Sequence, residues 1–385
     1  MAPPAALLVL AGGCFGSGPR SSPAPGHPTA TEATVSGPSS PSVTPQKLSL
    51  KQLAGQRIVY AYAGLHPPSS LIGAIRAGEA GGVILFGPNI ASRSQIRSAI
   101  KQLQQAALAS PVHVRLLILT DQEGGEVRRL PGAPSLSERQ IGQALDASAQ
   151  AQAAGSGAGR NLAGVGINVN LSPVLDVYRQ AGNFIDQYQR SYSSDPAFVG
   201  KLGAAFISAQ QRTGVAATAK HFPGLGAATR AENTDLRPVT LTLSLQSLRS
   251  VDESPYVQAI AAGVKLVMTS WATYPALDPR RPAGLSSVVI TRELRGRLGF
   301  RGVTITDGID AGAVVPFGSL GARSVMAASA GADLILCAAT NPAANSPQIG
   351  LTAMNALTSA LTKHQLTRAS AQQAVGRILK LRRNL

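Results

Sequence analysis

Short apolar runs alternate with longer amphipathic segments from about residue 48 to the end of the chain. The short runs are rich in Val, Ile and Leu, which predicts β-strands. They span 57–62, 82–86, 116–120, 167–174, 215–220, 265–269, 302–306 and 333–337. Segments with helical spacing lie between them, at 94–108, 147–163, 196–213, 245–262 and 290–298. Continuous apolar strands that alternate with helices are typical of a parallel sheet covered on both faces.

This pattern predicts an α/β fold, a (β/α)8 TIM-like barrel that forms a single domain over residues 47–385. Eight strand candidates within about 335 residues match the usual size of such a barrel with some insertions. A doubly wound sheet is the alternative. It is disfavoured because no Gly-x-Gly-x-x-Gly turn follows the first strand and no Walker loop is present.

The N-terminal residues have a different composition. Residues 15–46 are mostly Gly, Ser, Pro and Thr, which predicts a disordered tether. Before it, the apolar stretch 5–13 ends at Cys14, and Leu10-Ala-Gly-Gly-Cys14 resembles a bacterial lipoprotein signal. Residues 1–14 are therefore interpreted as that signal, with Cys14 as the lipidated residue. Two features depart from it: no Lys or Arg precedes Cys14, and Ala11 stands where Leu is usual. A disordered Ala/Leu-rich terminus is the alternative.

The composition excludes some classes of protein and indicates which kinds of partner to expect. The chain is 44% hydrophobic and only 14% charged, which excludes a wholly disordered protein. Its net charge of +16 favours anionic neighbours such as wall polymers or lipid headgroups. No nucleic-acid-reading motif accompanies that charge, so no nucleic acid partner is expected. Two cysteines are too few for a disulfide framework or a cysteine-rich metal site, and neither a metal nor a cofactor is expected.

Polar side chains follow several of the predicted strands. In a barrel the carboxyl ends of the strands meet at one face, and the chemistry of such enzymes gathers there. Acids from different strands and a Lys-His pair would thus share one polar pocket. The residues in these positions are Asp121, Asp176, Lys220, His221, Thr269, Ser270 and Asp307.

Six motifs in the right order resemble glycoside hydrolase family 3, in particular its single-domain β-N-acetylhexosaminidase branch. They are Gly81-Gly-Val-Ile-Leu-Phe86, Asp121-Gln-Glu-Gly-Gly125, Leu171-Ser-Pro-Val-Leu-Asp176, Lys220-His-Phe-Pro-Gly224, Tyr274-Pro-Ala-Leu-Asp278 and Gly302-Val-Thr-Ile-Thr-Asp307. The resemblance runs from about residue 50 to 340. It implies a TIM-like barrel, in agreement with the strand pattern, and a carbohydrate substrate.

The resemblance also implies roles for individual residues. Asp307 corresponds to the nucleophile that forms a glycosyl-enzyme intermediate, a role that suits a carboxylate ionised at neutral pH. Without the resemblance, a helix N-cap would be the simpler interpretation of Asp307. Asp176 and Asp278 are interpreted as structural acids. The residues implied in sugar binding are Asp121, Arg129, Arg190, Lys220 and His221, with surface or structural roles as the alternative for each.

One loop departs from the family pattern. After Lys-His-Phe-Pro-Gly the family branch continues with His-Gly-Asp and then Asp-Ser-His, whose last His is the general acid/base. Here the loop from Leu225 to Asp235 contains no histidine. Three interpretations stay open: Asp235, or less favourably Glu232, replaces that histidine; the enzyme works poorly or only on activated substrates; or the pocket binds sugars without cleaving them.

The expected function is therefore a retaining glycosidase, lipid-anchored or secreted by a bacterium. Its expected substrate is a terminal β-linked sugar, with N-acetylglucosamine of cell-wall fragments as the leading candidate. The alternative is a catalytically impaired sugar-binding lipoprotein on the same barrel. In both cases the lipid anchor would be the only link to a membrane, because no apolar run is long enough to span one.

Overall fold

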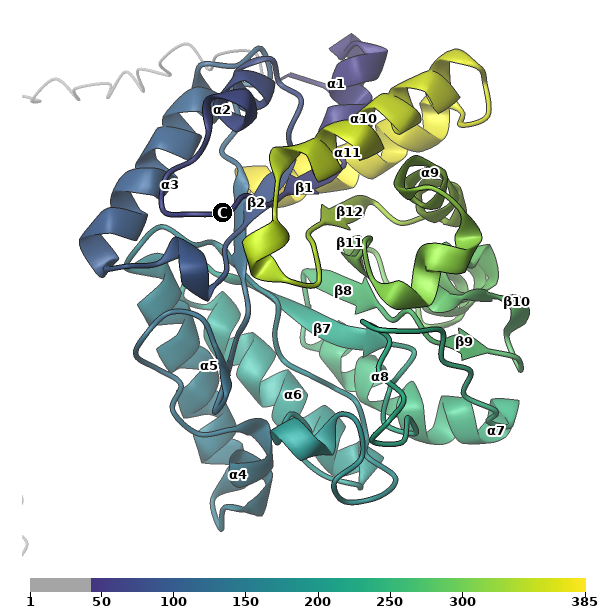
Figure 1. Cartoon of the computed structure of the whole chain (residues 1–385). Helices are drawn as coiled ribbons and strands as arrows, with labels where there is room; N and C mark the ends of the chain where they lie inside the picture. Colours follow the sequence, from purple (N-terminus) through teal and green to yellow (C-terminus); the bar gives the residue numbers. More distant parts are fainter. Residues whose placement is uncertain (1–42) are drawn as a thin grey trace, which may run out of the picture. The chain divides into compact units, whose positions relative to one another are not determined.

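The computed structural model describes residues 43–385, and its centre is a closed barrel of eight parallel strands in the order β1-β12-β11-β8-β7-β6-β3-β2 (Figure 1). Each of these strands overlaps one predicted apolar run, and closure of the sheet excludes the doubly wound alternative. The strands are β1 (Ile58–Tyr60), β2 (Gly82–Ile84), β3 (Leu117–Thr120), β6 (Val169–Asn170), β7 (Ala216–Phe222), β8 (Leu266–Thr269), β11 (Val303–Gly308) and β12 (Leu334–Cys337).

Helices surround the barrel in the predicted alternation. They are α1 (Leu50–Gly55), α2 (Ser69–Arg76), α3 (Arg93–Leu108), α4 (Glu138–Gln143), α5 (Ala147–Ala163), α6 (Pro196–Gln211), α7 (Leu245–Ser247), α8 (Ser254–Ala261), α9 (Leu320–Ala330), α10 (Pro347–Thr362) and α11 (Arg368–Arg383). Two segments, Leu248–Asp252 and Val288–Arg297, have π-helical turns. Short 3-10 turns occupy Pro45–Lys47, Gly87–Asn89, Asp186–Tyr188, Ala283–Leu285, Gly312–Phe317 and Pro342–Ala344.

The single helix predicted over 245–262 is divided in the structure. The π-helical turn separates α7 from α8, and Pro255 stands in the first turn of α8. Proline lacks the backbone N–H that a helix interior needs, so it favours the start of a new helix. The helical periodicity of this region is real, but the proline determines where the second helix begins.

Two hairpins were not predicted. The first joins β4 (Gln122–Gly124) to β5 (Val127–Arg128), and the second joins β9 (Thr273–Tyr274) to β10 (Asp278–Pro282). Both follow barrel strands at their carboxyl ends. Strands β4, β5 and β9 have three residues or fewer, and β10 is a polar segment with two prolines, so none of them gives an apolar periodic signal in the sequence.

Helix α11 closes the end of the barrel at which the strands begin. Its Ile378 and Leu381 belong to the same apolar cluster as Val59, Leu117 and Leu266, which lie on barrel strands. Burial of such side chains stabilises the fold by roughly 1.5–3 kcal/mol each. Arg382, near the end of α11, donates to the carbonyls of Arg115 and Val114, both at 2.6 Å. The opposite end, where the strands finish, is not covered by this helix.

The compact unit begins slightly before the predicted boundary at residue 47. Val43 packs against the core, and Arg368 of α11 donates to the carbonyls of Gln46 and Leu48. The predicted signal with Cys14 and most of the predicted tether lie outside the described residues. Among residues 43–385, no helix has the length and apolar character needed to cross a bilayer.

Candidate active site

A cavity of about 540 Å³ opens at the carboxyl ends of the strands. The structure brings seven of the eight predicted catalytic and sugar-binding residues to its wall. Glu232 does not line the cavity, and its carboxylate instead accepts a hydrogen bond from the backbone N–H of Thr229 at 2.7 Å. The seven lining residues are Asp121, Arg129, Arg190, Lys220, His221, Asp235 and Asp307.

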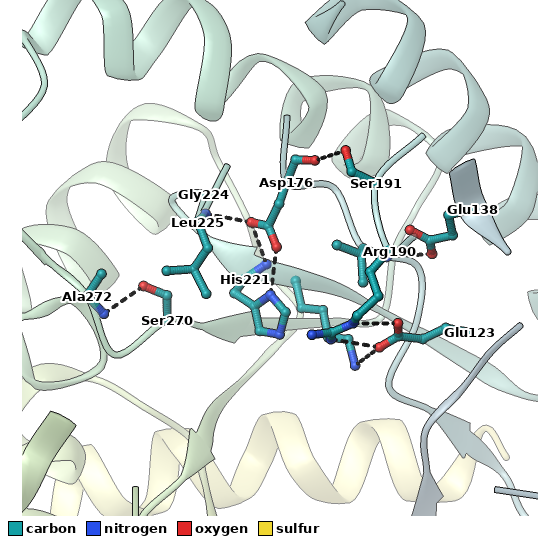
Figure 2. A network of polar contacts seen from close by, with 12 residues as sticks. Glu123, Glu138, Asp176, Arg190, Ser191, His221, Gly224, Leu225, Ser270 and Ala272 are labelled. Carbon is teal, nitrogen blue, oxygen red and sulfur yellow. Dashed lines mark hydrogen bonds and ion pairs between the residues drawn. The ribbon is translucent and has the colours of Figure 1, made fainter. Parts of the chain in front are cut away.

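A cluster of ion pairs forms one side of the cavity. Lys220 Nζ lies 3.0 Å from Asp121 Oδ1 and 2.6 Å from Glu123 Oε1. Arg190 contacts Glu123 with two nitrogens, Nε at 2.8 Å from Oε2 and Nη2 at 2.9 Å from Oε1 (Figure 2). Bidentate pairing of this kind fixes both side chains in position. Asp121 and Glu123 come from the end of β3 and from β4, Lys220 from β7, and Arg190 from the segment before α6, so the cluster joins three parts of the barrel.

The charges in this cluster keep one another ionised. Burial alone would raise the pKa of Asp121, but the Lys220 ammonium and the Arg129 guanidinium reverse the effect and lower it. The pKa of Glu123 is likewise lowered despite burial, by Arg190 and Lys220. The pKa of Lys220 is raised by the two carboxylates against the opposing effect of burial. Fixed carboxylates and an ammonium can hydrogen-bond sugar hydroxyls as acceptors and donors.

Arg129 retains donor capacity that the protein does not use. Its Nε lies 3.8 Å from Asp121 Oδ2, which is too long for a hydrogen bond, and that nitrogen is buried without a partner in the described residues. A buried donor without a partner costs free energy, so a ligand oxygen that accepts from it would be favoured. Arg129 is thus suited to bind a ligand in the cavity.

Asp176 fixes the orientation of the His221 imidazole through a hydrogen bond. His221 Nδ1 lies 2.7 Å from Asp176 Oδ2, while the other carboxylate oxygen accepts from the backbone N–H of Leu225 at 2.7 Å (Figure 2). Asp176 is fully buried, in keeping with its prediction as a structural acid. An ionised carboxylate at Nδ1 favours the tautomer with a proton on that nitrogen, which leaves Nε2 as an acceptor for the cavity.

Asp307 stands at the end of β11, on the cavity wall. Its Oδ1 accepts from the backbone N–H of Gly308 at 2.7 Å, and Trp271 Nε1 donates to the Gly308 carbonyl at 2.8 Å. The N-cap alternative does not fit, since the next helical turn begins only at Gly312 and its N-cap is Ala311. The strand end and the Trp271 side chain therefore hold a carboxylate that has no capping role.

Asp235 lies on the loop that departs from the family pattern. The Asp235 carbonyl accepts from Gly312 N at 2.7 Å, and that of Thr234 from Ala313 N at 3.0 Å, so the loop is bonded to the segment after β11. Its side chain lines the cavity, although the residue as a whole is exposed to solvent. Desolvation, together with the negative charge of Asp307, raises the pKa of Asp235 to about 6. A carboxyl with this pKa can give and take a proton near neutral pH.

Two buried acids at the site had no role in the sequence analysis. Glu123 follows Asp121 by two residues and belongs to a quoted motif, but its ion pairs depend on Arg190, far away in the chain. Glu138 of α4 accepts from Val174 N at 2.9 Å, and burial together with the charge of Glu123 raises its pKa well above the ordinary value. No local pattern signals either role, because the partners come from other elements. Within residues 43–385 no group of His, Cys, Asp or Glu is arranged to hold a metal ion.

Residues 51–381 match the family described as "Glycosyl hydrolase family 3 N terminal domain". The chain belongs to this family. A relative from Arthroderma benhamiae, called an "Uncharacterized secreted glycosyl hydrolase", is 44% identical over 88% of this chain and 94% of its own. A "Beta-hexosaminidase" of Xanthomonas oryzae pv. oryzae is 35% identical over 66% of this chain and 75% of its own.

Solved structures agree with the family assignment. A family 3 "beta-N-acetylglucosaminidase" from Paenibacillus sp. matches with a TM-score of 0.81 and 36% identity. The match covers 88% of this chain and 62% of the Paenibacillus chain, so this protein spans under two thirds of that relative. The predicted barrel and the predicted resemblance to the β-N-acetylhexosaminidase branch are both confirmed.

Proposed function

We propose that this protein is a retaining glycosidase that removes a terminal β-linked sugar, with N-acetylglucosamine as the preferred residue. The observation that carries the proposal is the pairing of two carboxyls on one cavity wall. Asp307 follows the family's strand-end position, and Asp235 has a pKa raised to about 6. A double displacement needs one carboxylate that attacks the anomeric carbon and a second carboxyl that can give and take a proton.

In the first step Asp307 attacks the anomeric carbon and forms a covalent ester, while the bond from that carbon to the leaving oxygen breaks. The Asp235 carboxyl gives its proton to that oxygen. In the second step the Asp235 carboxylate takes a proton from water, whose oxygen attacks the same carbon and releases Asp307. The sugar leaves with its original configuration, and both carboxyls return to their starting states.

The polar side chains of the cavity wall would hold the sugar in place for these steps. Asp121 and Lys220 offer an acceptor and donors, Arg129 offers a buried donor, and His221 offers an acceptor at Nε2. Such contacts would hold the anomeric carbon in a reactive position relative to Asp307. The names of the hexosaminidase and N-acetylglucosaminidase relatives support the choice of an N-acetylated sugar.

The proposal also places the protein outside the cytoplasm, held to a membrane by a lipid on Cys14. The Leu10-Ala-Gly-Gly-Cys14 sequence and the Ser/Pro/Thr-rich segment after it support this. The name of the secreted Arthroderma benhamiae relative supports export. Replacement of Cys14 by Ser should release the protein from the membrane fraction, and a wild-type protein that stays in the cytoplasm would contradict the proposal.

The function is tested with nitrophenyl N-acetyl-β-glucosaminide and with cell-wall fragments, while NMR follows the configuration of the released sugar. We expect turnover of both substrates and an initial β-anomer. Release of the α-anomer would exclude the double displacement. Saturable sugar binding without any turnover would instead support the sugar-binding alternative.

A further inference from the structure

The exposed acids of the described residues all lie toward one end of the barrel, whereas exposed Lys and Arg side chains lie at both ends. Each exposed acid lies in a segment that follows a barrel strand or in the residues just before the next helix. These positions belong to the end where the cavity opens. The exposed acids are Glu126, Asp146, Asp195, Asp235 and Asp310.

The opposite end, where helices lead back into strands, exposes only bases. Its two acids are already neutralised among the described residues: Glu79 pairs with Lys51 at 3.0 Å, and Asp333 is fully buried, 2.6 Å from Arg295 Nη2 and 2.7 Å from Arg377 Nη2. Exposed Arg76 is the last residue of α2, and the other exposed bases in these helix-to-strand segments are Arg115, Arg212, Lys265 and Arg301.

Helix α11 adds to this positive surface. It closes the same end of the barrel (Figure 1), contacts β11, and exposes Lys380 and Arg383. Arg383 Nη2 also donates to the carbonyl of Val43, the first described residue. The chain therefore joins the barrel at its positive end. We call this surface the basic end; its residues are Arg76, Arg115, Arg212, Lys265, Arg301, Lys380 and Arg383.

A recess of about 590 Å³ lies at the rim of the basic end, between the last turns of α5 and α6. Arg160 and Arg212 line it, together with the small polar residues Ser156 and Thr213. Neither guanidinium pairs with a carboxylate of residues 43–385. Two free guanidinium groups beside hydroxyls suit a phosphate group, because guanidinium can donate to its oxygens in pairs.

We propose that the basic end binds the surface of an anionic phospholipid membrane, so that the catalytic cavity faces away from the lipid. A single-sign surface is attracted to anionic headgroups, and each Lys or Arg near such a surface strengthens binding by roughly fivefold. The chain's entry at Val43 favours a membrane over an anionic wall polymer, because a lipid on Cys14 would hold this end toward the bilayer. This last point rests on the proposed anchor, while the charge distribution is independent of the glycosidase activity.

The test uses the full chain with Cys14→Ser, so that binding cannot come from an attached lipid. Sedimentation with vesicles of phosphatidylcholine alone, or mixed with phosphatidylglycerol, measures affinity at several salt concentrations. Arg115→Gln/Lys265→Gln/Lys380→Gln removes three charges from the basic end. None of these side chains makes a hydrogen bond or ion pair to the described residues, so the fold should persist.

A matched variant removes the same number of charges elsewhere: Lys201→Gln/Arg280→Gln/Arg281→Gln, at exposed positions on α6 and β10. We expect the protein to bind the mixed vesicles but not those of phosphatidylcholine alone, and salt should weaken this binding. The affinity for the mixed vesicles should fall at least about tenfold in the basic-end variant and stay nearly unchanged in the matched variant. Equal losses in both variants would reduce the effect to net charge and overturn the proposal. Binding to teichoic-acid-bearing walls but not to the mixed vesicles would also overturn it. Turnover of an aryl glycoside plays no part in this readout, so failure of the proposed enzyme function would be recognised separately.

Discussion

Asp235 should control the pH dependence of cleavage. An Asp with its ordinary pKa of 3.8 would keep its proton in fewer than roughly one molecule in a thousand at pH 7, whereas a pKa of about 6 raises that to roughly one in ten. Asp235 must be protonated to serve as acid, so kcat/KM on natural linkages should fall with rising pH above about 6. The slope should be about tenfold per pH unit.

The assay compares pH profiles on a wall-derived disaccharide and on a dinitrophenyl glycoside, whose leaving group needs no proton. With the disaccharide, Asp235→Asn should abolish the fall of kcat/KM above about pH 6 and should lower the rate of cleavage by about a hundredfold or more. The first step on the dinitrophenyl substrate should change little. Azide should then restore turnover by replacing the activated water. Glu232→Gln, outside the cavity, is the matched control and should keep the wild-type profile. If kcat/KM of Asp235→Asn still falls above about pH 6, Asp235 is not the general acid.

Three further variants test the residues around the cavity. Asp176→Asn removes the carboxylate that fixes the tautomer of His221, so kcat/KM should fall by on the order of tenfold to a hundredfold; an unchanged value would show that His221 needs no orientation. Glu123→Gln removes the negative charge that pairs with Lys220 and Arg190, so it should lower the free energy of unfolding in urea by about 3 kcal/mol or more. A loss under half that size would show that these ion pairs do not stabilise the fold. Trp271→Phe removes the hydrogen bond to the Gly308 carbonyl and part of a fully buried ring, so it should lower the free energy of unfolding by more than about 1 kcal/mol in the same assay, whereas unchanged stability would mean that both losses are compensated.

The barrel could be predicted from the sequence because its strands are buried on both faces. Val303–Thr306 and Leu334–Cys337, for example, are continuous apolar or threonine-containing runs with almost no exposed surface. The helix over 147–163 was also predicted with its observed bounds. The hairpins and the break before Pro255 depend on short-range geometry and could not be placed by periodicity alone.

The candidate site was predictable only in part. The strand-end positions of Asp121, Lys220 and Asp307 follow from the barrel rule, and their implied roles follow from the family resemblance. The ion pairs of Glu123 could not be predicted, since its partner Arg190 is 67 positions away and its other partner, Lys220, is farther still. The raised pKa of Asp235 depends on how its loop packs beside Asp307, which no sequence pattern records.

The central claim is that Asp307 forms a covalent bond to the sugar. It is tested most directly by mass spectrometry of the protein after reaction with an activated fluorinated N-acetyl-β-glucosaminide, which slows the second step. We predict one sugar adduct on the peptide that contains Asp307, and none on Asp307→Asn. Full turnover by Asp307→Asn, or an adduct on another residue, would contradict the account.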